Sequence, residues 1–154
     1  MIPSVHLQFG DARWRKVRGL SARLDAAALR ALAKGKAPRH ATLTVLLTDD
    51  AQMQSLNHDF RAKNKPTNVL SFPAAANGDH YLGDIALGYE MIRAEARAAN
   101  KRLADHATHL VVHGVLHLLG FDHAAPRQAR AMESLETAIL AELGIADPYA
   151  TEAA

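Results

Sequence analysis

Three histidines in the last third of the chain have the spacing of a metal site. They are His113, His117 and His123, within the segment HGVLHLLGFDH. In an α-helix, positions 113 and 117 lie on one face a single turn apart, so both imidazoles can reach one ion. Gly120 can end that helix in a left-handed conformation, and the reversed chain can bring His123 back as a third ligand. Three imidazoles leave one tetrahedral position open, as in catalytic rather than structural zinc sites.

The other histidines fit such a site less well. The chain has nine histidines and no cysteine, so any metal must be held by His, Asp or Glu. At about 1.5 Å of rise per residue, His106 lies roughly 10 Å along the helix from His113, and His109 roughly 12 Å from His117. Neither can join a site built on 113 and 117. A 109/113 pair is geometrically possible, but it would leave the glycine turn and the third histidine without a role.

The histidine spacing also matches that of the metzincin proteases, in which a general-base glutamate follows the first histidine. Gly114 occupies that position here. Glycine inside a helix costs about 1 kcal/mol relative to alanine, so a close approach of backbone or substrate would explain it. The metal spacing is therefore kept, while the group that activates water for peptide hydrolysis is missing.

The elements that must position these residues are strands early in the chain and helices late, which indicates an α+β fold. Asp49 or Asp50 can cap a helix, and Pro126 suits the first turn of another. The last two predicted strands can pair as a hairpin. We predict strands over residues 5–9, 42–48, 68–72 and 81–87, and helices over residues 14–33, 51–60, 89–102, 105–119 and 126–143.

Length and composition predict one domain. The chain has 154 residues, 49% apolar and 22% charged, which excludes a disordered or fibrous protein. We expect a single domain over residues 1–146 and a short flexible tail over residues 147–154. No apolar run approaches the roughly 20 residues that cross a bilayer, and the N-terminus lacks a signal-peptide pattern. These features predict a cytoplasmic protein that does not engage a membrane.

Charge is unevenly distributed along the chain. Residues 1–65 hold 12 Lys and Arg against 5 Asp and Glu, whereas residues 131–154 hold none against 5. This asymmetry is typical either of a protein with a polyanionic partner or of an ordinary solvated surface. The loop over residues 61–67 carries Arg61, Lys63 and Lys65. The tryptophan at position 14 is interpreted as a helix anchor rather than an RNA contact, and Asp84 as a hydrogen-bonding residue of the sheet.

Four segments together resemble one known family. They are the histidine motif, Asn57 to Arg61 (NHDFR), Lys65 to Pro73 (KPTNVLSFP) and Leu82 to Ile85 (LGDI), and they span most of the chain in the family's order. The chain resembles the YbeY family of bacterial rRNA maturation factors, which are zinc-dependent endoribonucleases with a zincin-like fold. It departs from the family at Asn68, where aspartate is usual.

The resemblance implies a single-domain zincin-like α+β fold, in which a small mixed sheet packs with helices and the metal site lies on a helix and the following turn. It implies that His113, His117 and His123 hold one Zn²⁺ per chain and that Arg61 is needed for activity. The implied activity is single-strand-specific cleavage of rRNA precursors, in 16S 3′-end processing and ribosome quality control. Implied partners are RNA and the ribosomal small subunit or assembly proteins.

Elementary chemistry agrees with RNA cleavage at such a site. Zinc lowers the pKa of bound water to about 7 and polarises a phosphoryl oxygen, and Arg61 can stabilise the charge that develops on the phosphate. Arg61, Lys63 and Lys65 are predicted to bind the RNA backbone. The general base stays open: bound hydroxide can suffice, and Asp122 can instead orient a ligand histidine.

Two other functions compete with this interpretation. One is a metalloprotease-like hydrolase without its usual glutamate. The other is a non-catalytic ribosome assembly factor in which zinc only stabilises the fold. The first predicts chelator-sensitive peptide cleavage, and the second predicts unfolding when His117 is replaced.

Overall fold

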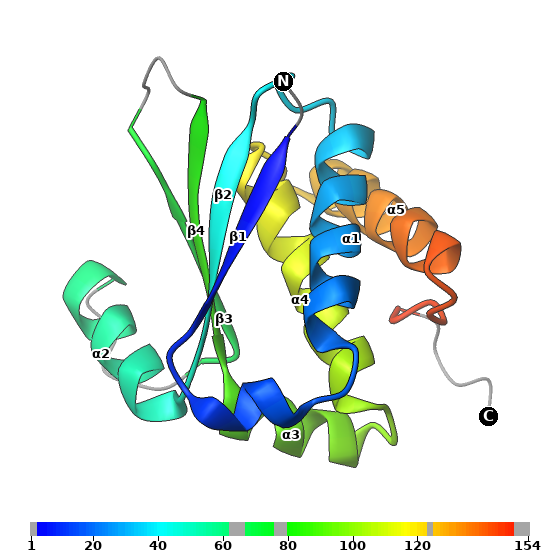
Figure 1. The fold of residues 1–154 in the computed structure, drawn as a ribbon. Coiled ribbons are helices and arrows are strands. Elements are labelled where there is room, and N and C mark those ends of the chain that lie inside the picture. Colours follow the sequence, from blue (N-terminus) through cyan, green and yellow to red (C-terminus); the bar gives the residue numbers. More distant parts are fainter. Residues whose placement is uncertain (1–2, 62–66, 76–79, 123–124, 150–154) are drawn as a thin grey trace.

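The computed structural model describes residues 3–61, 67–75, 80–122 and 125–149, with the side chains of Phe60 and Arg61 excepted. The chain forms a four-stranded sheet in the order β1-β2-β4-β3, with helices on both faces (Figure 1). The elements are β1 (Ser4–Phe9), the 3-10 helix η1 (Ala12–Lys16), α1 (Leu20–Lys34), β2 (Thr42–Thr48), α2 (Asp50–Arg61), β3 (Val69–Pro73), β4 (Tyr81–Gly88), α3 (Tyr89–Ala98), α4 (Leu103–Leu118) and α5 (Pro126–Glu142).

The sheet is mixed. β1, β2 and β4 run parallel, while β3 and β4 form an antiparallel pair, which confirms the predicted hairpin. The α+β fold class is also confirmed. Pro73 ends β3, which is an edge strand, where the missing N–H costs no ladder hydrogen bond to a further strand.

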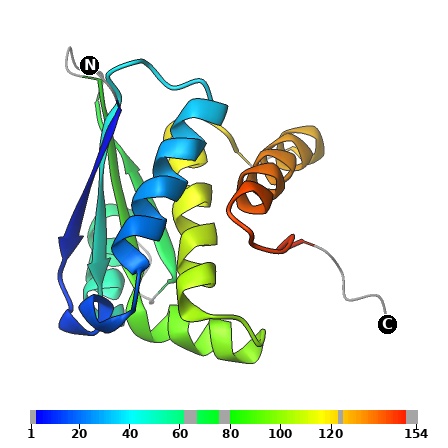
Figure 2. The same cartoon turned by 45° about the vertical axis from the view of Figure 1, so that its right-hand side comes forward.

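The helices form layers around the sheet. α1 and α4 lie side by side on one face, and α5 packs outside them (Figures 1 and 2). The core between sheet and helices includes Leu43, Val45, Ile85, Val111 and Val115, all fully or almost fully buried. α2 covers part of the opposite face through a second, smaller cluster of Met53, Leu70 and Ala86. The helix that carries the histidines is thus fixed by packing along its whole length.

The predicted helix over residues 14–33 is wrong at its start. The chain instead forms η1, turns at Gly19 with φ +72°, and begins α1 at Leu20. Trp14 causes the difference: its side chain is fully buried and its indole N–H donates to Thr48 O at 2.8 Å. This tertiary contact overrides a local sequence that favours helix. The anchor interpretation of Trp14 is confirmed.

The helix ends follow the predicted capping chemistry. Asp49 Oδ1 accepts from Gln52 N at 2.8 Å, so Asp49 caps α2. Pro126 is the first residue of α5, as expected. The predicted helix over residues 89–102 is shorter in the structure, because α3 ends at Ala98 and Asn100 adopts φ +57°. α4 then begins at Leu103.

Gly114 lies where α4 approaches the sheet most closely. A Cβ atom at this position would come within 3.0 Å of both Cδ1 and Cγ2 of Ile85 on β4. Ser71 Oγ of β3 also donates to Gly114 O at 3.3 Å. The glycine therefore serves the close packing of backbone against sheet, one of the two reasons considered for it.

We predict that Gly114→Ala destabilises the protein by roughly 1–2 kcal/mol, because overpacking against Ile85 outweighs the helix propensity that alanine adds. Chemical denaturation followed by circular dichroism measures this difference. In an Ile85→Val background, which removes the Cδ1 atom, the destabilisation should shrink. A Gly114→Ala protein more stable than wild type would show that the close approach imposes no constraint.

Candidate metal centre

His113 and His117 lie one turn apart in the second half of α4, and their rings meet. The ring centroids are 4.5 Å apart at an interplanar angle of 79°, and the two Nε2 atoms are 3.0 Å apart. Both side chains are partly buried, with 20% of the His113 side chain exposed. The spacing of the two histidines thus brings their Nε2 atoms close enough to bind one ion.

The partners of the Nδ1 atoms determine which nitrogen of each ring carries hydrogen. His113 Nδ1 lies 2.8 Å from Glu136 Oε1, and His117 Nδ1 lies 3.0 Å from the carbonyl oxygen of Phe121. A carboxylate and a carbonyl only accept hydrogen bonds, so each Nδ1 is the donor. In the neutral imidazoles both Nε2 atoms therefore present lone pairs, and the lone pairs face each other.

This arrangement fits a metal ion. Two acceptor nitrogens 3.0 Å apart repel unless a cation lies between them, either a proton or a metal ion. Nitrogen ligands at 2.0–2.1 Å from a tetrahedral zinc lie about 3.3 Å from each other. The observed separation is close to this value, and the Nδ1–H contacts to acceptors are the outer hydrogen bonds that metal-binding histidines ordinarily make.

The turn after α4 contributes to the same geometry. Gly120 adopts φ +99°, Gly120 N donates to His117 O at 3.0 Å, and Phe121 N donates to Leu116 O at 3.0 Å. These are the two hydrogen bonds of a Schellman motif, and they confirm that Gly120 ends the helix. The motif also points Phe121 O at His117, so the turn itself orients this ring.

His123, the third predicted ligand, lies outside the described residues. Within the ranges that the structure describes, no group of three or more His, Cys, Asp or Glu side chains could hold a metal ion. The ligand set of His113, His117 and His123 therefore stays a prediction, supported by the geometry of its first two members. Asp122, the candidate orienting group, is exposed, and its role also stays a prediction.

Glu136 is a residue of this site that the sequence analysis missed. Its side chain is fully buried on α5, and besides His113 it accepts a hydrogen bond from His109 Nε2 at 2.9 Å and one from the hydroxyl of Tyr149. Burial would raise the pKa of Glu136, but the hydrogen bonds from the two histidines and the tyrosine outweigh it and lower the pKa to about 2. Glu136 is therefore a carboxylate at neutral pH.

The sequence held one signal for Glu136. Met132, Ile139 and Leu140 give α5 a buried apolar face, and Glu136 lies on this face one turn after Met132. A glutamate that interrupts an apolar stripe is seldom buried without a partner. The identity of the partner could not be read from the stripe, because it depends on how α5 crosses α4.

The histidines earlier in α4 are held by carboxylates. His106 Nε2 lies 2.9 Å from Glu95 Oε1 on α3, and His109 bonds Glu136 as described. The Asn68 side chain donates to the same Glu95 oxygen at 3.0 Å. An aspartate at position 68 would place a second carboxylate against Glu95, so the amide suits this contact.

Asp84 is hydrogen-bonded by Tyr81, which confirms its interpretation as a hydrogen-bonding residue of the sheet.

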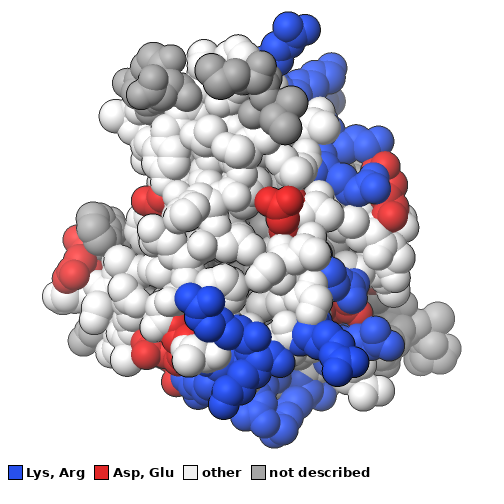
Figure 3. All heavy atoms as spheres, viewed as in Figure 1, with Lys and Arg blue, Asp and Glu red and all other residues white. Residues whose placement is uncertain are grey.

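Of the three cationic residues predicted to bind RNA, only the backbone of Arg61 is described. Arg61 is the last residue of α2, and its side chain lies outside the described part of the chain. Lys63 and Lys65 lie outside the described residues altogether. Elsewhere, lysine and arginine side chains gather at the end of the molecule formed by η1 and α3 (Figure 3). Arg13 of η1 is paired there, at 2.7 Å from Asp11 and 3.2 Å from Glu90.

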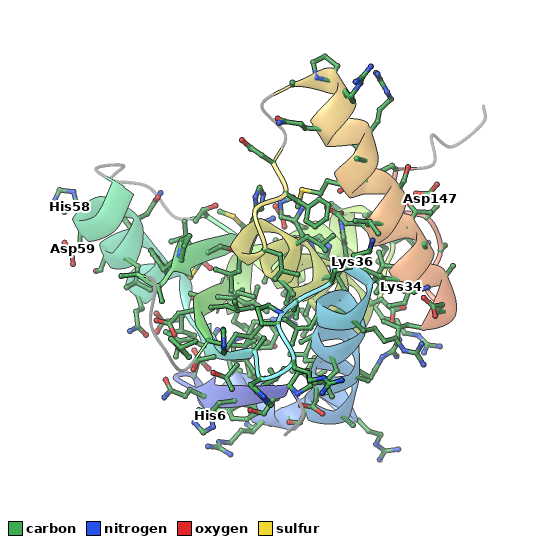
Figure 4. All side chains as sticks on the ribbon, turned by 90° about the horizontal axis from the view of Figure 1, so that it is seen from above. His6, Lys34, Lys36, His58, Asp59 and Asp147 are labelled. Atoms are coloured by element: carbon green, nitrogen blue, oxygen red, sulfur yellow. The ribbon has the colours of Figure 1, made fainter. Side chains whose placement is uncertain are left out.

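A hollow of about 1010 Å³ lies on the sheet face opposite α1 and α4. Polar residues in its wall include Gln8, Thr44, Tyr81 and Asp84, and the described residues that line it include no histidine, lysine or arginine. Figure 4, seen from above, places His58 and Asp59 of α2 at the periphery, away from α4. Neither His113 nor His117 lines the hollow, but Ser71, which does, donates to the carbonyl oxygen of Gly114 between them.

Comparison with known proteins identifies the family of this chain. A family model described as Endoribonuclease YbeY matches residues 13–144. The chain is 50% identical over 139 residues to "Endoribonuclease YbeY" of Chelativorans sp. strain BNC1, covering 87% of this chain and 83% of that protein. It is 43% identical over 166 residues to the protein of the same name from Ruegeria pomeroyi, covering 97% and 99%.

One solved structure has the same fold. The solution structure of TM1509 from Thermotoga maritima superposes with a TM-score of 0.60 at 22% identity, covering 96% of this chain and 99% of that one. The family match over residues 13–144, together with the histidine pair it contains, shows that this chain belongs to the endoribonuclease YbeY family.

Proposed function

We propose that this chain is a zinc-dependent endoribonuclease that cleaves single-stranded regions of rRNA precursors, including the 3′ end of 16S rRNA, and acts in ribosome quality control. Membership of the YbeY family makes it an RNA-cleaving hydrolase. The observation that carries the zinc proposal is the close approach of His113 Nε2 and His117 Nε2, which lie 3.0 Å apart.

In this proposal His113, His117 and His123 hold one zinc ion. Bound zinc supplies a Lewis acid for a phosphoryl oxygen and lowers the pKa of the attacking water. Glu136 and the Phe121 carbonyl keep the first two rings oriented. Gly114 stands where a metzincin has its glutamate and is packed against Ile85, so the protease alternative lacks its general base.

Arg61 and the loop that follows it supply the cations. Since α2 ends at Arg61, this residue joins a helix to the segment that carries Lys63 and Lys65. We assign Arg61 to the charge that develops on the phosphate, and the two lysines to neighbouring phosphates. Aromatic residues make up only 5% of the chain, so recognition rests on the RNA backbone more than on base stacking.

The proposed setting is the cytoplasm, with the ribosomal small subunit or its assembly proteins as further partners. None of the helices in the described ranges combines the length and apolar character that a bilayer crossing needs. Early residues of the chain carry most of the positive charge, which suits an RNA partner.

We predict that His117→Ala lowers bound zinc well below one equivalent and abolishes RNA cleavage, because one of the paired ligands is gone. Elemental analysis, circular dichroism and an RNA cleavage assay measure metal, fold and activity on the same preparation. A chelator should likewise stop cleavage by the wild type. If His117→Ala unfolds the domain and wild type cleaves no RNA, the non-catalytic assembly factor is the better account.

For Arg61→Ala we expect unchanged zinc content and fold, with cleavage reduced by about 10²–10³, the typical cost of losing a group that stabilises transition-state charge. Arg39→Ala, which removes an exposed arginine between α1 and β2, is the matched control and should cleave normally. Unchanged cleavage by Arg61→Ala would remove this arginine from the mechanism.

The double variant Lys63→Ala/Lys65→Ala should bind RNA more weakly, and the salt dependence of binding should flatten by about 0.7 of a slope unit for each phosphate of the single strand that is no longer neutralised. Lys34→Ala is the control, since this lysine lies 3.5 Å from Glu142 on the α1–α5 side of the molecule. An unaltered slope in the double variant would contradict the assignment of these lysines to phosphates.

A further inference from the structure

We infer that Glu136 and Tyr149 together position His113 for metal binding, so that the segment after α5 is a working part of the metal centre. We call these two residues the carboxylate clamp. The inference rests on the proposed zinc site and deepens it. It assigns a positioning role to Tyr149, which lies beyond residues 13–144, the part of the chain that the family model matches.

The two oxygens of Glu136 are both engaged. Oε1 accepts from His113 Nδ1 at 2.8 Å, and Oε2 accepts from His109 Nε2 at 2.9 Å and from the Tyr149 hydroxyl. The carboxylate is fully buried, so its orientation is set by these donors rather than by water. The hydroxyl of Tyr149 is thus one of the groups that hold Oε1 against His113.

The segment after α5 is itself fixed against that helix. Asp147 Oδ1 accepts from Thr137 Oγ1 at 3.2 Å and from Tyr149 N at 2.8 Å. The Tyr149 ring meets His109 edge-on, with centroids 5.7 Å apart. Asp147 and Tyr149 belong to the segment predicted as a flexible tail, and the predicted boundary at residue 146 stays a prediction.

The carboxylate clamp determines which nitrogen of the His113 ring carries hydrogen. Because a carboxylate only accepts, His113 carries a hydrogen on Nδ1, so in the neutral ring the Nε2 lone pair is directed at His117. A glutamine at position 136 can present its amide N–H to Nδ1, which permits the opposite tautomer. Tyr149 does not contact His113 in this scheme but donates to the Glu136 carboxylate and holds it in place.

Zinc affinity of the full chain, measured by competition with a chelator of known affinity, tests the clamp. Outer partners of metal-binding histidines typically contribute 10–100-fold in metal affinity, so Glu136→Gln should weaken zinc binding by about that factor. Tyr149→Phe should weaken it by about 3–10-fold, the effect of losing one hydrogen bond to a carboxylate that remains in place. Thermal unfolding of the metal-free proteins establishes that both variants are folded.

Tyr81→Phe is the matched control. The Tyr81 hydroxyl also donates to a carboxylate, that of Asp84, and lies 2.8 Å from Thr44 Oγ1, but on the sheet away from the histidines. This variant should bind zinc like the wild type. Equal weakening in Tyr81→Phe and Tyr149→Phe would overturn the inference, because the effect would then reflect stability alone.

A second readout does not depend on bound metal. Nitrogen NMR of the metal-free protein reports the tautomer of His113, which should be Nδ1–H in wild type and shift toward Nε2–H in Glu136→Gln. A wild type that binds zinc while Tyr149→Phe has the same affinity overturns the clamp and leaves the proposed function standing. A wild type that binds no zinc at all overturns both.

Discussion

This site depends on the contact between His113 Nε2 and His117 Nε2, which lie 3.0 Å apart. In the neutral rings the lone pair of each nitrogen is directed at the other. Such a contact is unfavourable between two neutral imidazole rings unless a cation lies between them. The fold enforces it from outside: a buried carboxylate on α5 holds one ring, and a backbone carbonyl in the turn after α4 holds the other. Both rings are thereby held so that their Nε2 atoms lie close together.

The rest of the structure serves to keep these groups in register. Packing of Gly114 against Ile85 fixes the depth of α4 on the sheet, and the Schellman turn at Gly120 fixes where the chain leaves the helix. α5 must then cross α4 so that Glu136 reaches His113. Burial of this carboxylate is tolerated because three donors meet it, which is also why its pKa stays low.

Local sequence was sufficient for the parts of the site that lie close together in the chain. The pairing of His113 with His117 follows from helical geometry, and the end of α4 follows from the glycine at position 120. Asp49 and Pro126 marked helix starts correctly for the same reason, since capping depends on neighbours within one turn. The hairpin of β3 and β4 was likewise a local feature.

Contacts between distant elements could not be predicted in this way. Glu136 and Tyr149 reach the histidines only through the crossing of α5 over α4 and the path of the chain after it. Trp14 broke a predicted helix because its indole binds Thr48 O, which is 34 residues away in the chain. Asn68, which directly precedes β3, meets Glu95 on α3, a contact that also rationalises an amide at position 68.

The most direct test of the central claim is a crystal structure of the protein grown with zinc, with anomalous scattering measured at the zinc edge. We predict one anomalous peak per chain at about 2.0–2.1 Å from the Nε2 atoms of both His113 and His117. No peak between these rings, or a peak bound through Nδ1 with Glu136 displaced, would contradict it.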